Sequence, residues 1–316
     1  MANELAIIPA DAHKLVQTFL EGRNVNTREA YRADLCDFAS YLRSSSEQQA
    51  LTQLLSLQAG PANLLVLEYR NSLIERSLQS ATINRRLSSL RAFVKLARMT
   101  GFVPWSIEVP NLKHESYRDT RGTGISGVSR MLAKLASRND PKSVRDAALI
   151  RLFFDLGLRV SEAVGLDISD LDLAMNTISI IGKGWTQKQT LSVPQPTIEA
   201  IQKWLAVRPR SESQAVFLNF DRAGKKAGRI SRFGVYKLVR RLGEDLSLKT
   251  RPHAIRHDAV NAAIKVAQEN EIELPSILKF SRHKSLTTLQ VYIDAVSDRQ
   301  GEIASLVAGS LSRKLK

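Results

Sequence analysis

Apolar side chains recur every three or four residues through much of the first hundred positions, a spacing typical of helices with one buried face. The pair Asn26 and Glu29 resembles a capping box and predicts a helix start, while Gly60-Pro61 predicts a break. The apolar stripes are Tyr31, Leu35, Phe38 and Leu42; Leu64, Leu67 and Leu73; and Ile83, Leu87, Leu90 and Val94. We therefore expect residues 1–105 to form a helical domain.

The pattern changes in the following residues. Positions 106–125 contain prolines and glycines but no sustained period, which predicts a linker. Beyond it, a helix is expected to start at Asp140 and to end at Gly157, in the left-handed conformation that often closes helices. Two β-rich runs, residues 177–181 and 190–194, flank a glycine-containing tip and predict a β-hairpin. Helical spacing dominates the remainder.

Composition places the chain among ordinary globular proteins. Of its 316 residues, 43% are hydrophobic and 24% are charged, which argues against a disordered, collagenous or fibrous chain. No apolar run approaches the ~20 residues needed for a membrane span, and the N-terminus does not resemble a secretory signal. A single cysteine, Cys36, excludes an internal disulfide framework and fits a reducing, intracellular compartment.

The charge balance points to a polyanionic partner. Lys and Arg number 46 against 31 Asp and Glu, a formal net charge of +15. Between Lys203 and Arg256 alone there are 14 basic and 4 acidic residues, so the excess is concentrated late in the chain. Aromatic residues make up only 6%, which favours contact with duplex phosphates over stacking on single strands. A basic but merely soluble surface is the alternative.

Four segments that are far apart in the sequence carry arginine, lysine, histidine or tyrosine side chains. They are residues 156–162 (LGLRVSE), 182–184 (GKG), 252–257 (PHAIRH) and 282–292, which ends in a tyrosine. With their neighbours they form the strings TREAYRADLCDFASYL, SATINRRLSSLRAFVKLARMTGF, LGLRVSEAVGLDISDLDL and SRHKSLTTLQVYID. These strings, in this order, resemble the tyrosine recombinase (phage integrase) family over nearly the whole chain.

The resemblance implies a mainly α fold with a small antiparallel β-sheet, arranged as a two-domain, C-shaped DNA clamp. Residues 1–105 would form the helical core-binding domain, 106–125 the linker and 126–316 the catalytic domain. Such enzymes are site-specific recombinases that cut and rejoin DNA through a 3′-phosphotyrosyl intermediate, for integration, excision or dimer resolution. The resemblance further implies a homotetramer on two duplexes, a bacterial cytoplasmic location, no membrane association and no cofactor; no metal-ligand cluster stands out either.

By the same resemblance, Tyr292 is the nucleophile. A phenol has a pKa of about 10, so its proton must leave as it attacks the scissile phosphate. Arg159 and Arg256 would stabilise the charge that develops on the non-bridging oxygens, because a guanidinium is always charged and offers a planar fork of donors. Glu162, one helical turn after Arg159, is expected to support the site by orienting His253 or an arginine.

The remaining assignments concern protons and hydrogen bonds. Lys183, at the hairpin tip, is the expected general acid for the leaving 5′-oxygen, with Lys188 as the alternative. His253 is the expected general base or phosphate donor, and His283 would donate a hydrogen bond to the phosphate. The family usually has Leu-Gly-His before the nucleophile helix, whereas this chain has arginine at position 282 where glycine would permit a positive φ.

Two surfaces complete the hypothesis. Near or in the major groove we expect the polar face of the third helix, comprising Thr82, Arg85, Arg86 and Ser89, with plain solvation as the alternative. A terminal apolar stripe is expected to dock on a neighbouring subunit or on the chain's own core; it comprises Ile303, Leu306, Val307 and Leu311. The rival functions are a type IB topoisomerase and a DNA-binding regulator that has lost cleavage.

Overall fold

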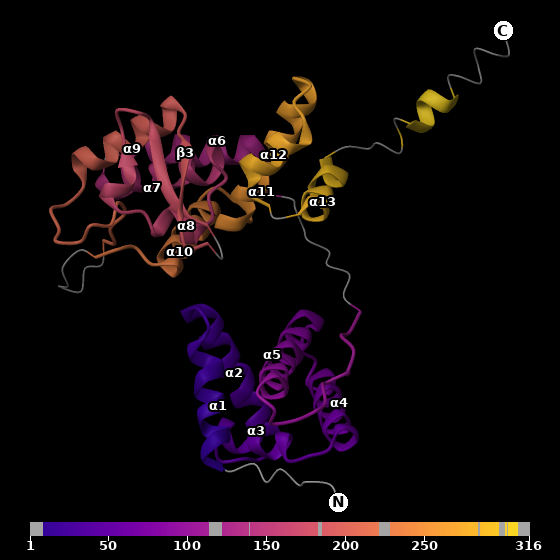
Figure 1. The fold of residues 1–316 in the computed structure, drawn as a ribbon. Helices are drawn as coiled ribbons and strands as arrows, with labels where there is room; N and C mark the ends of the chain where they lie inside the picture. The colour runs from indigo at the N-terminus through magenta and orange to yellow at the C-terminus, as the bar shows by residue number, and fades with distance from the viewer. Residues whose placement is uncertain are drawn as a thin grey trace, which may run out of the picture. The chain divides into compact units, whose positions relative to one another are not determined.

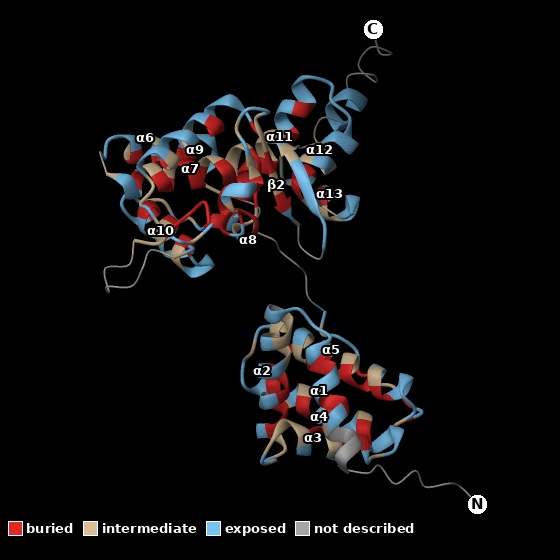
Figure 2. Cartoon of the chain, turned by 60° about the vertical axis from the view of Figure 1, so that its left-hand side comes forward, coloured by how far each residue is buried: buried red, intermediate tan, exposed pale blue. Residues whose placement is uncertain are grey.

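The chain forms two compact units in a computed structural model. The structure describes residues 9–113, 122–138, 140–182, 185–220, 228–283, 285–296, 301 and 303–308. The first unit covers Met1–Tyr117 and the second Arg118–Lys316, and each has its own set of buried residues (Figures 1 and 2). As expected from the sequence, the fold is mainly α-helical with one small antiparallel sheet.

The N-terminal unit is a helical bundle. Its helices are α1 (Pro9–Glu21), α2 (Val25–Tyr41), α3 (Glu47–Leu55), α4 (Ala59–Glu75) and α5 (Ser80–Met99). Most residues of the apolar stripes meet in one core, whereas Leu64 is 56% exposed and its predicted burial is wrong. In that core the rings of Phe38 and Tyr69 pack edge to face with their centroids 5.0 Å apart. The Tyr69 hydroxyl donates a hydrogen bond to Asp37 Oδ2 at 2.8 Å, so its burial leaves no phenolic donor unpaired.

Two further details of this unit differ from the sequence-based expectations. Helix α2 is capped by Asn24, whose side chain accepts from the Thr27 amide, so the predicted capping box at Asn26 is wrong. The predicted break at Gly60-Pro61 is also wrong, because both residues lie in the first turn of α4, where a helix needs no proline N–H. The segment after α5 packs on the core of this unit through Val103, Trp105, Ile107 and Val109.

The C-terminal unit combines helices with a three-stranded sheet. Its elements are α6 (Gly124–Ala136), α7 (Pro141–Asp155), α8 (Val160–Val164), the 3-10 turn η1 (Ile168–Asp170), β1 (Leu171–Asp172), β2 (Thr177–Ile181), β3 (Lys188–Ser192), α9 (Gln195–Val207), α10 (Arg232–Glu244), α11 (Pro252–Glu269), α12 (Leu274–Ser281) and α13 (Leu286–Val296). The predicted hairpin is confirmed: β2 pairs antiparallel with β3, with Thr177 opposite Ser192. Residues 303–308 are helical as well.

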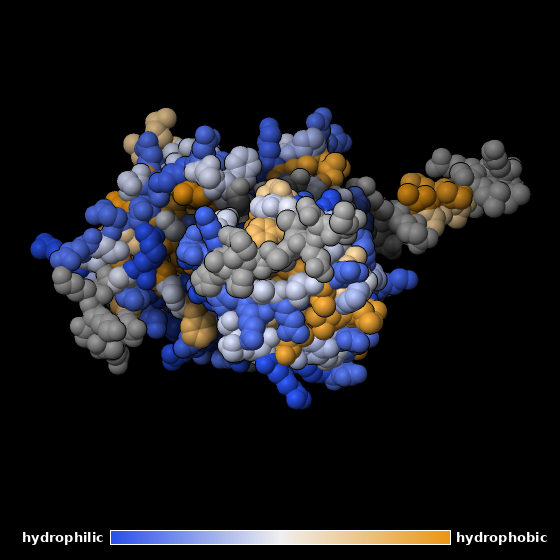
Figure 3. Space-filling view, turned by 60° about the horizontal axis from the view of Figure 1, so that its bottom comes forward, coloured by the Kyte–Doolittle hydropathy of each residue, from blue (hydrophilic) through white to orange (hydrophobic). Residues whose placement is uncertain are grey.

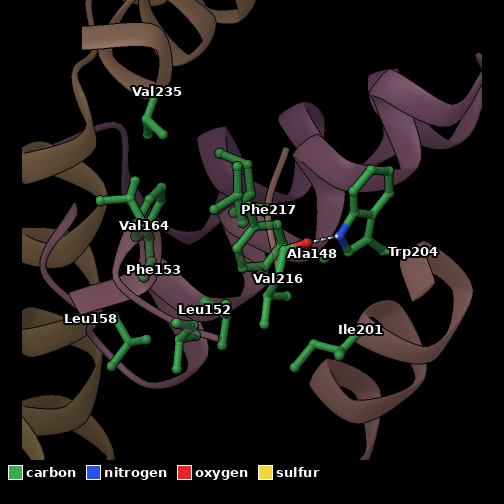
Figure 4. Packing of buried hydrophobic residues seen from close by; sticks show 14 of the residues in the cluster. Ala148, Leu152, Phe153, Leu158, Val164, Ile201, Trp204, Val216, Phe217 and Val235 are labelled. Carbon is green, nitrogen blue, oxygen red and sulfur yellow. Dashed lines mark hydrogen bonds between the residues drawn. The ribbon is translucent and has the colours of Figure 1, made fainter. Parts of the chain in front are cut away.

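Helix α7 lies at the centre of this unit's core. Leu149, Leu152 and Phe153 are fully buried and belong to the same cluster as Trp204 of α9. The Trp204 indole donates a hydrogen bond to the Val216 carbonyl at 2.8 Å, which Figure 4 draws as a dashed line beside Ala148 and Phe217. Helix α7 matters for the site, because its C-terminal end leads directly into the segment 156–162, which carries Arg159.

Hydrogen bonds connect the residues at the start of α6 to helix α11. The Asp258 carboxylate, buried to 5% exposure, accepts from the amides of Thr123 at 2.9 Å and Gly124 at 3.0 Å. A Cβ on Gly122 would lie 2.2 Å from Asp258 Oδ1, so only glycine permits this close approach. In the part of the chain that the structure describes, no helix is both long and apolar enough to cross a membrane.

Candidate active site

Helix α11 gathers three basic side chains on one face. Pro252 occupies its first turn, where the fixed φ of proline suits a helix start, and the motif follows at once. His253, Arg256 and His257 are three and four positions apart, a spacing that places side chains one above another on a helix. Arg256 and His257 are buried, at 2% and 4% exposure.

The Arg256 guanidinium connects α11 to two other parts of the unit. Its Nη1 donates to the Gly157 carbonyl at the end of α7, and its Nη2 donates to the Ser281 carbonyl at the end of α12. Gly157 has a φ of 54°, in the left-handed region expected for a residue closing a helix. Arg256 therefore holds the two turns that carry Arg159 and His283 beside each other.

Arg159 is the N-cap of helix α8 and is paired with Glu162 on the same helix. Glu162 Oε1 accepts from Arg159 Nη1 at 2.8 Å, and Oε2 accepts from the Arg159 backbone N–H at 2.8 Å. The carboxylate side chain is 1% exposed, whereas the arginine side chain is 26% exposed and can reach an external anion. The sequence left open whether Glu162 orients His253 or an arginine, and its recorded bonds are to arginines.

Arg282 brings a third guanidinium to the same place. It ends α12 with φ 52° and ψ 37°, the left-handed conformation that glycine would adopt at this position. Its Nη2 donates to Glu162 Oε2 at 3.2 Å, and its own carbonyl accepts from Arg159 Nη2 at 3.3 Å. The departure from the usual glycine thus keeps the backbone geometry and adds a cation.

Aromatic contacts place Tyr292 against the histidines. Tyr292 is 3% exposed on α13, and its ring centroid lies 5.2 Å from that of His257 and 5.2 Å from that of His283. The rings of His253 and His257 are in edge contact, with centroids 4.3 Å apart. The phenol that the sequence singles out therefore packs against helix α11 of its own chain, close to the arginine cluster.

Electrostatics tie these groups together. Burial, then the positive charges of Arg159 and Arg282, lowers the pKa of Arg256 to about 10, while Glu162 and Tyr292 act in the opposite direction. Burial, followed by the charge of His253 and other basic neighbours, lowers the pKa of His257 to about 4. At neutral pH the site therefore combines charged guanidinium groups with a neutral imidazole at position 257.

The sequence predicts Lys183 as the general acid, with Lys188 as the alternative. Lys183 lies outside the described residues. Lys188, on β3, forms an ion pair with the carboxylate of Asp170, and its side chain is 49% exposed. Lys188 and Glu162 line the same cavity of about 120 Å³, together with Ser161 and Ser179. Lys188 is thus near the arginine cluster but held by an acidic partner.

No group of three or more His, Cys, Asp or Glu side chains could hold a metal ion among the residues that the structure describes. The cationic character of the site comes instead from arginines. Among the described residues, Glu162 is the only carboxylate that pairs with both Arg159 and Arg282. The arrangement can bind a phosphodiester and place a phenol beside it.

The polar residues chosen on α5 are less exposed than the sequence suggests. Ser89 is fully buried and donates to the Arg86 carbonyl at 2.8 Å, so its predicted place on a DNA-facing surface is wrong. The Arg86 side chain is only 15% exposed and bonds Asp37 Oδ2 at 2.5 Å. Arg85 is 44% exposed and pairs with Asp34. Thr82 is half-buried.

Comparison with known proteins identifies the family. Residues 126–299 match the model of the phage integrase family. A tyrosine recombinase of Synechococcus elongatus is 37% identical over 310 residues, which cover 96% of this chain and 95% of the relative. The chain belongs to the phage integrase family. It is a tyrosine recombinase, an enzyme of site-specific DNA recombination.

A further curated recombinase is similar in sequence to this recombinase, and solved structures share its fold. The tyrosine recombinase XerC of Yersinia pestis is 28% identical over 269 residues, covering 84% of this chain and 83% of the relative. Among solved structures, the XerH recombinase bound to its palindromic difH substrate has a TM-score of 0.67 at 18% identity, covering 94% of this chain and 85% of XerH. The Tn1549 transposon integrase, in complex with circular intermediate DNA, has a TM-score of 0.57 at 17% identity, covering 78% and 86%.

Two residues at the site of this recombinase were not assigned from sequence. His257 lies between His253 and Tyr292 in the chain of ring contacts, and its spacing of four from His253 was the available signal. Arg282 was noted only as a departure from glycine. Its contact with Glu162, 120 residues earlier in the chain, cannot be inferred from the neighbouring sequence.

Proposed function

We propose that this recombinase cleaves one DNA strand by attack of the Tyr292 oxygen on the scissile phosphorus. A bond forms between the phenolic oxygen and phosphorus, the bond from phosphorus to the 5′-oxygen breaks, and a 3′-phosphotyrosyl link remains. The observation that carries the proposal is the packing of Tyr292 against His257 and His283 while the neighbouring Arg256 is bonded to the turn before Arg159. These groups come from elements far apart in the sequence.

The roles follow from the chemistry of each group. Arg159 and Arg256 stabilise the negative charge that builds on the non-bridging oxygens, since both carry fixed positive charge and spare N–H donors. Glu162 orients Arg159 through two bonds of 2.8 Å. His253 takes the phenolic proton, and His283 donates to the phosphate. His257, neutral at pH 7, is unsuited to donate a proton.

The leaving 5′-oxygen needs a proton from a general acid. We retain Lys183 in this role, with Lys188 as the alternative. The carboxylate of Asp170, which forms an ion pair with Lys188, holds the ammonium away from a phosphate. Rejoining runs the same steps in reverse, with the 5′-hydroxyl of a partner strand as the attacking group and the tyrosine as the leaving group. No external energy source is needed, because the link conserves the bond.

Duplex DNA with a specific recombination site is the proposed partner. The net charge of +15 supplies the general attraction, and helix α10 offers an exposed face that combines Arg232, Lys237 and Arg240 with Phe233 and Tyr236. Solved relatives such as XerH and the Tn1549 integrase were captured on DNA. The two units would close on the duplex as a clamp in the bacterial cytoplasm. On α5, Arg85 and Thr82 are better candidates for DNA contact than the more buried Arg86 and Ser89.

We also propose that four copies assemble on two duplexes. Ile303, Leu306 and Val307 are 60%, 74% and 62% exposed on the short helix at residues 303–308. The surface of this segment is largely hydrophobic (Figure 3). An exposed apolar stripe at the end of a chain is suited to docking on a second copy. Leu311, the fourth member of the predicted stripe, lies outside the described residues.

Covalent trapping tests the proposal. The purified chain is incubated with a pool of duplexes that have a randomised centre, stopped with SDS, and the DNA that remains bound to protein is sequenced. We expect a recovered site, and a free 5′-hydroxyl on the released strand that polynucleotide kinase labels directly. Tyr292→Phe should bind the recovered duplex and form no adduct. Tyr41→Phe, at a half-buried tyrosine on α2 of the N-terminal unit that belongs to neither the site nor the proposed DNA-binding face, is the matched control and should form the adduct normally.

The recovered duplex also distinguishes the proposed function from its two rivals. A recombinase exchanges strands between two duplexes that both carry the recovered site, whereas a type IB topoisomerase relaxes supercoiled plasmid without such pairs. A regulator that has lost cleavage would select a site and give no adduct at all. An adduct of undiminished yield from Tyr292→Phe would refute the nucleophile assignment.

A further inference from the structure

Arg282 uses its side chain for internal bonds. Nη1 donates to the carbonyls of Leu156 at 3.0 Å and Phe280 at 3.1 Å, and Nη2 donates to the Gly157 carbonyl at 2.7 Å and to Glu162 Oε2 at 3.2 Å. The side chain is 9% exposed. Four terminal N–H groups are therefore engaged, and the guanidinium has little left to offer an incoming phosphate.

These bonds close a loop through the first arginine of the site. The Arg282 guanidinium holds one oxygen of Glu162, the other oxygen holds the Arg159 guanidinium, and Arg159 Nη2 donates back to the Arg282 carbonyl at 3.3 Å. The orientation of Arg159 is thus determined by the turn between α12 and α13, not by its own helix alone. That turn leads into His283 and the helix that carries Tyr292.

The second arginine shares an acceptor with Arg282. Both Arg256 and Arg282 donate to the carbonyl of Gly157, whose left-handed φ of 54° directs the chain out of α7. Arg282 itself has a φ of 52°, a conformation that is unfavourable for any residue with a Cβ. A strained backbone persists where surrounding contacts over-determine it, and here the bonds of its own side chain provide those contacts.

We propose that Arg282 is a positioning residue that couples the orientation of Arg159 to the turn preceding the nucleophile helix. This inference rests on the proposed function, because it concerns the same reaction. Arg282 replaces the freedom of a glycine with a fixed cross-link between the α7–α8 turn and the α12–α13 turn. Through Glu162 it keeps the Arg159 guanidinium in one orientation before the phosphate arrives, and so reduces the reorganisation that the transition state requires.

Arg282→Gly separates the backbone from the side chain, since glycine accepts the left-handed conformation without strain. On the duplex recovered with the wild type, we expect single-turnover adduct formation to slow by roughly 100-fold at saturating DNA, with the half-saturating DNA concentration unchanged. Arg282→Lys, which keeps the charge but not the fork, should recover only part of the rate. Arg208→Lys is the matched control, since Arg208 also donates to backbone carbonyls of this unit, those of Ser213 and Ala215.

A measurement without DNA keeps the test independent of cleavage. Phenylglyoxal modifies accessible guanidinium groups, and mass spectrometry gives the rate at each arginine. Arg159 should react faster in Arg282→Gly than in the wild type, because its tether through Glu162 is loosened, while the rate at exposed Arg240 should not change. A variant that loses solubility would be replaced by Arg282→Lys in the same measurement, with the same expected direction.

The outcomes distinguish the two proposals. If wild type forms an adduct and folded Arg282→Gly forms it equally fast, with Arg159 equally protected, the positioning role is overturned and the proposed function stands. If the rate falls only because half-saturation shifts, Arg282 acts in DNA binding and the inference is wrong. If wild type forms no adduct on any duplex, the proposed function fails, and with it the role assigned here.

Discussion

Replacing Glu162 with glutamine tests how the arginine cluster is held together. The carboxylate is 1% exposed and accepts from Arg159 twice, at 2.8 Å each, and from Arg282 at 3.2 Å. Glu162→Gln keeps the size of the side chain but removes its charge, and it turns an amide N–H₂ toward at least one existing donor. Two guanidinium groups would then lack their shared counter-charge.

The expected magnitude follows from burial. Removing one partner of a buried ion pair costs roughly 3–5 kcal/mol of unfolding free energy. A loss of 1 kcal/mol lowers the unfolding midpoint by about 2–4 °C in a unit of this size, so the midpoint of the C-terminal unit should fall by roughly 6–20 °C. The N-terminal unit, which contains none of these residues, should unfold as before.

Scanning calorimetry of the full chain measures both transitions. The control is Glu244→Gln, whose side chain is 60% exposed and pairs with Arg240 one turn earlier at 2.8 Å. Exposed pairs of this kind contribute little, so the control should shift the midpoint hardly at all. Equal midpoints for the two variants would refute the reasoning that Glu162 is the buried counter-charge of the cluster.

Three further predictions follow from the described contacts. Folding lowers the pKa of His257 from 6.5 to about 4, so between these values the unfolded chain binds a proton that the folded chain does not. The contribution of His257 to the unfolding free energy is therefore complete above pH 6.5 and falls toward pH 4 by up to about 1.4 kcal/mol per pH unit. Urea titrations should find a shallower slope in His257→Phe. Asp258→Asn should lower the unfolding free energy measured in urea by roughly 1–3 kcal/mol, because both amides lose a charged acceptor and one of them faces an amide N–H₂ instead; no change would mean that the contact is dispensable. Removing residues 301–316 should abolish assembly on the recovered duplex in sedimentation experiments while single-copy binding persists, and intact assembly would exclude the docking role.

Short sequence patterns were enough to predict elements whose ends are set by neighbouring residues. The hairpin at residues 177–181 and 190–194 was accessible because β-branched runs flank glycines. The helix ending at Gly157 was accessible because a left-handed residue commonly closes a helix. The start of α2 was misjudged by two residues, because Asn24 and Asn26 are chemically equivalent caps and only the fold selects between them.

What the sequence could not reveal depends on partners from distant elements. Arg86 is mostly buried because Asp34 and Asp37 of α2 supply its counter-charge. Ser89 can be buried because its hydroxyl is satisfied by a carbonyl of its own helix, which no periodicity records. The contact of His257 with Tyr292 arises from the packing of α13 on α11, 35 residues later in the chain.

The bond between Asp258 and the amides of Thr123 and Gly124 has a mechanical consequence. Asp258 directly follows His257 on α11, so the residues that open α6 are held one position from the histidine whose ring contacts Tyr292. Loss of that carboxylate would free the start of α6 directly beside this histidine.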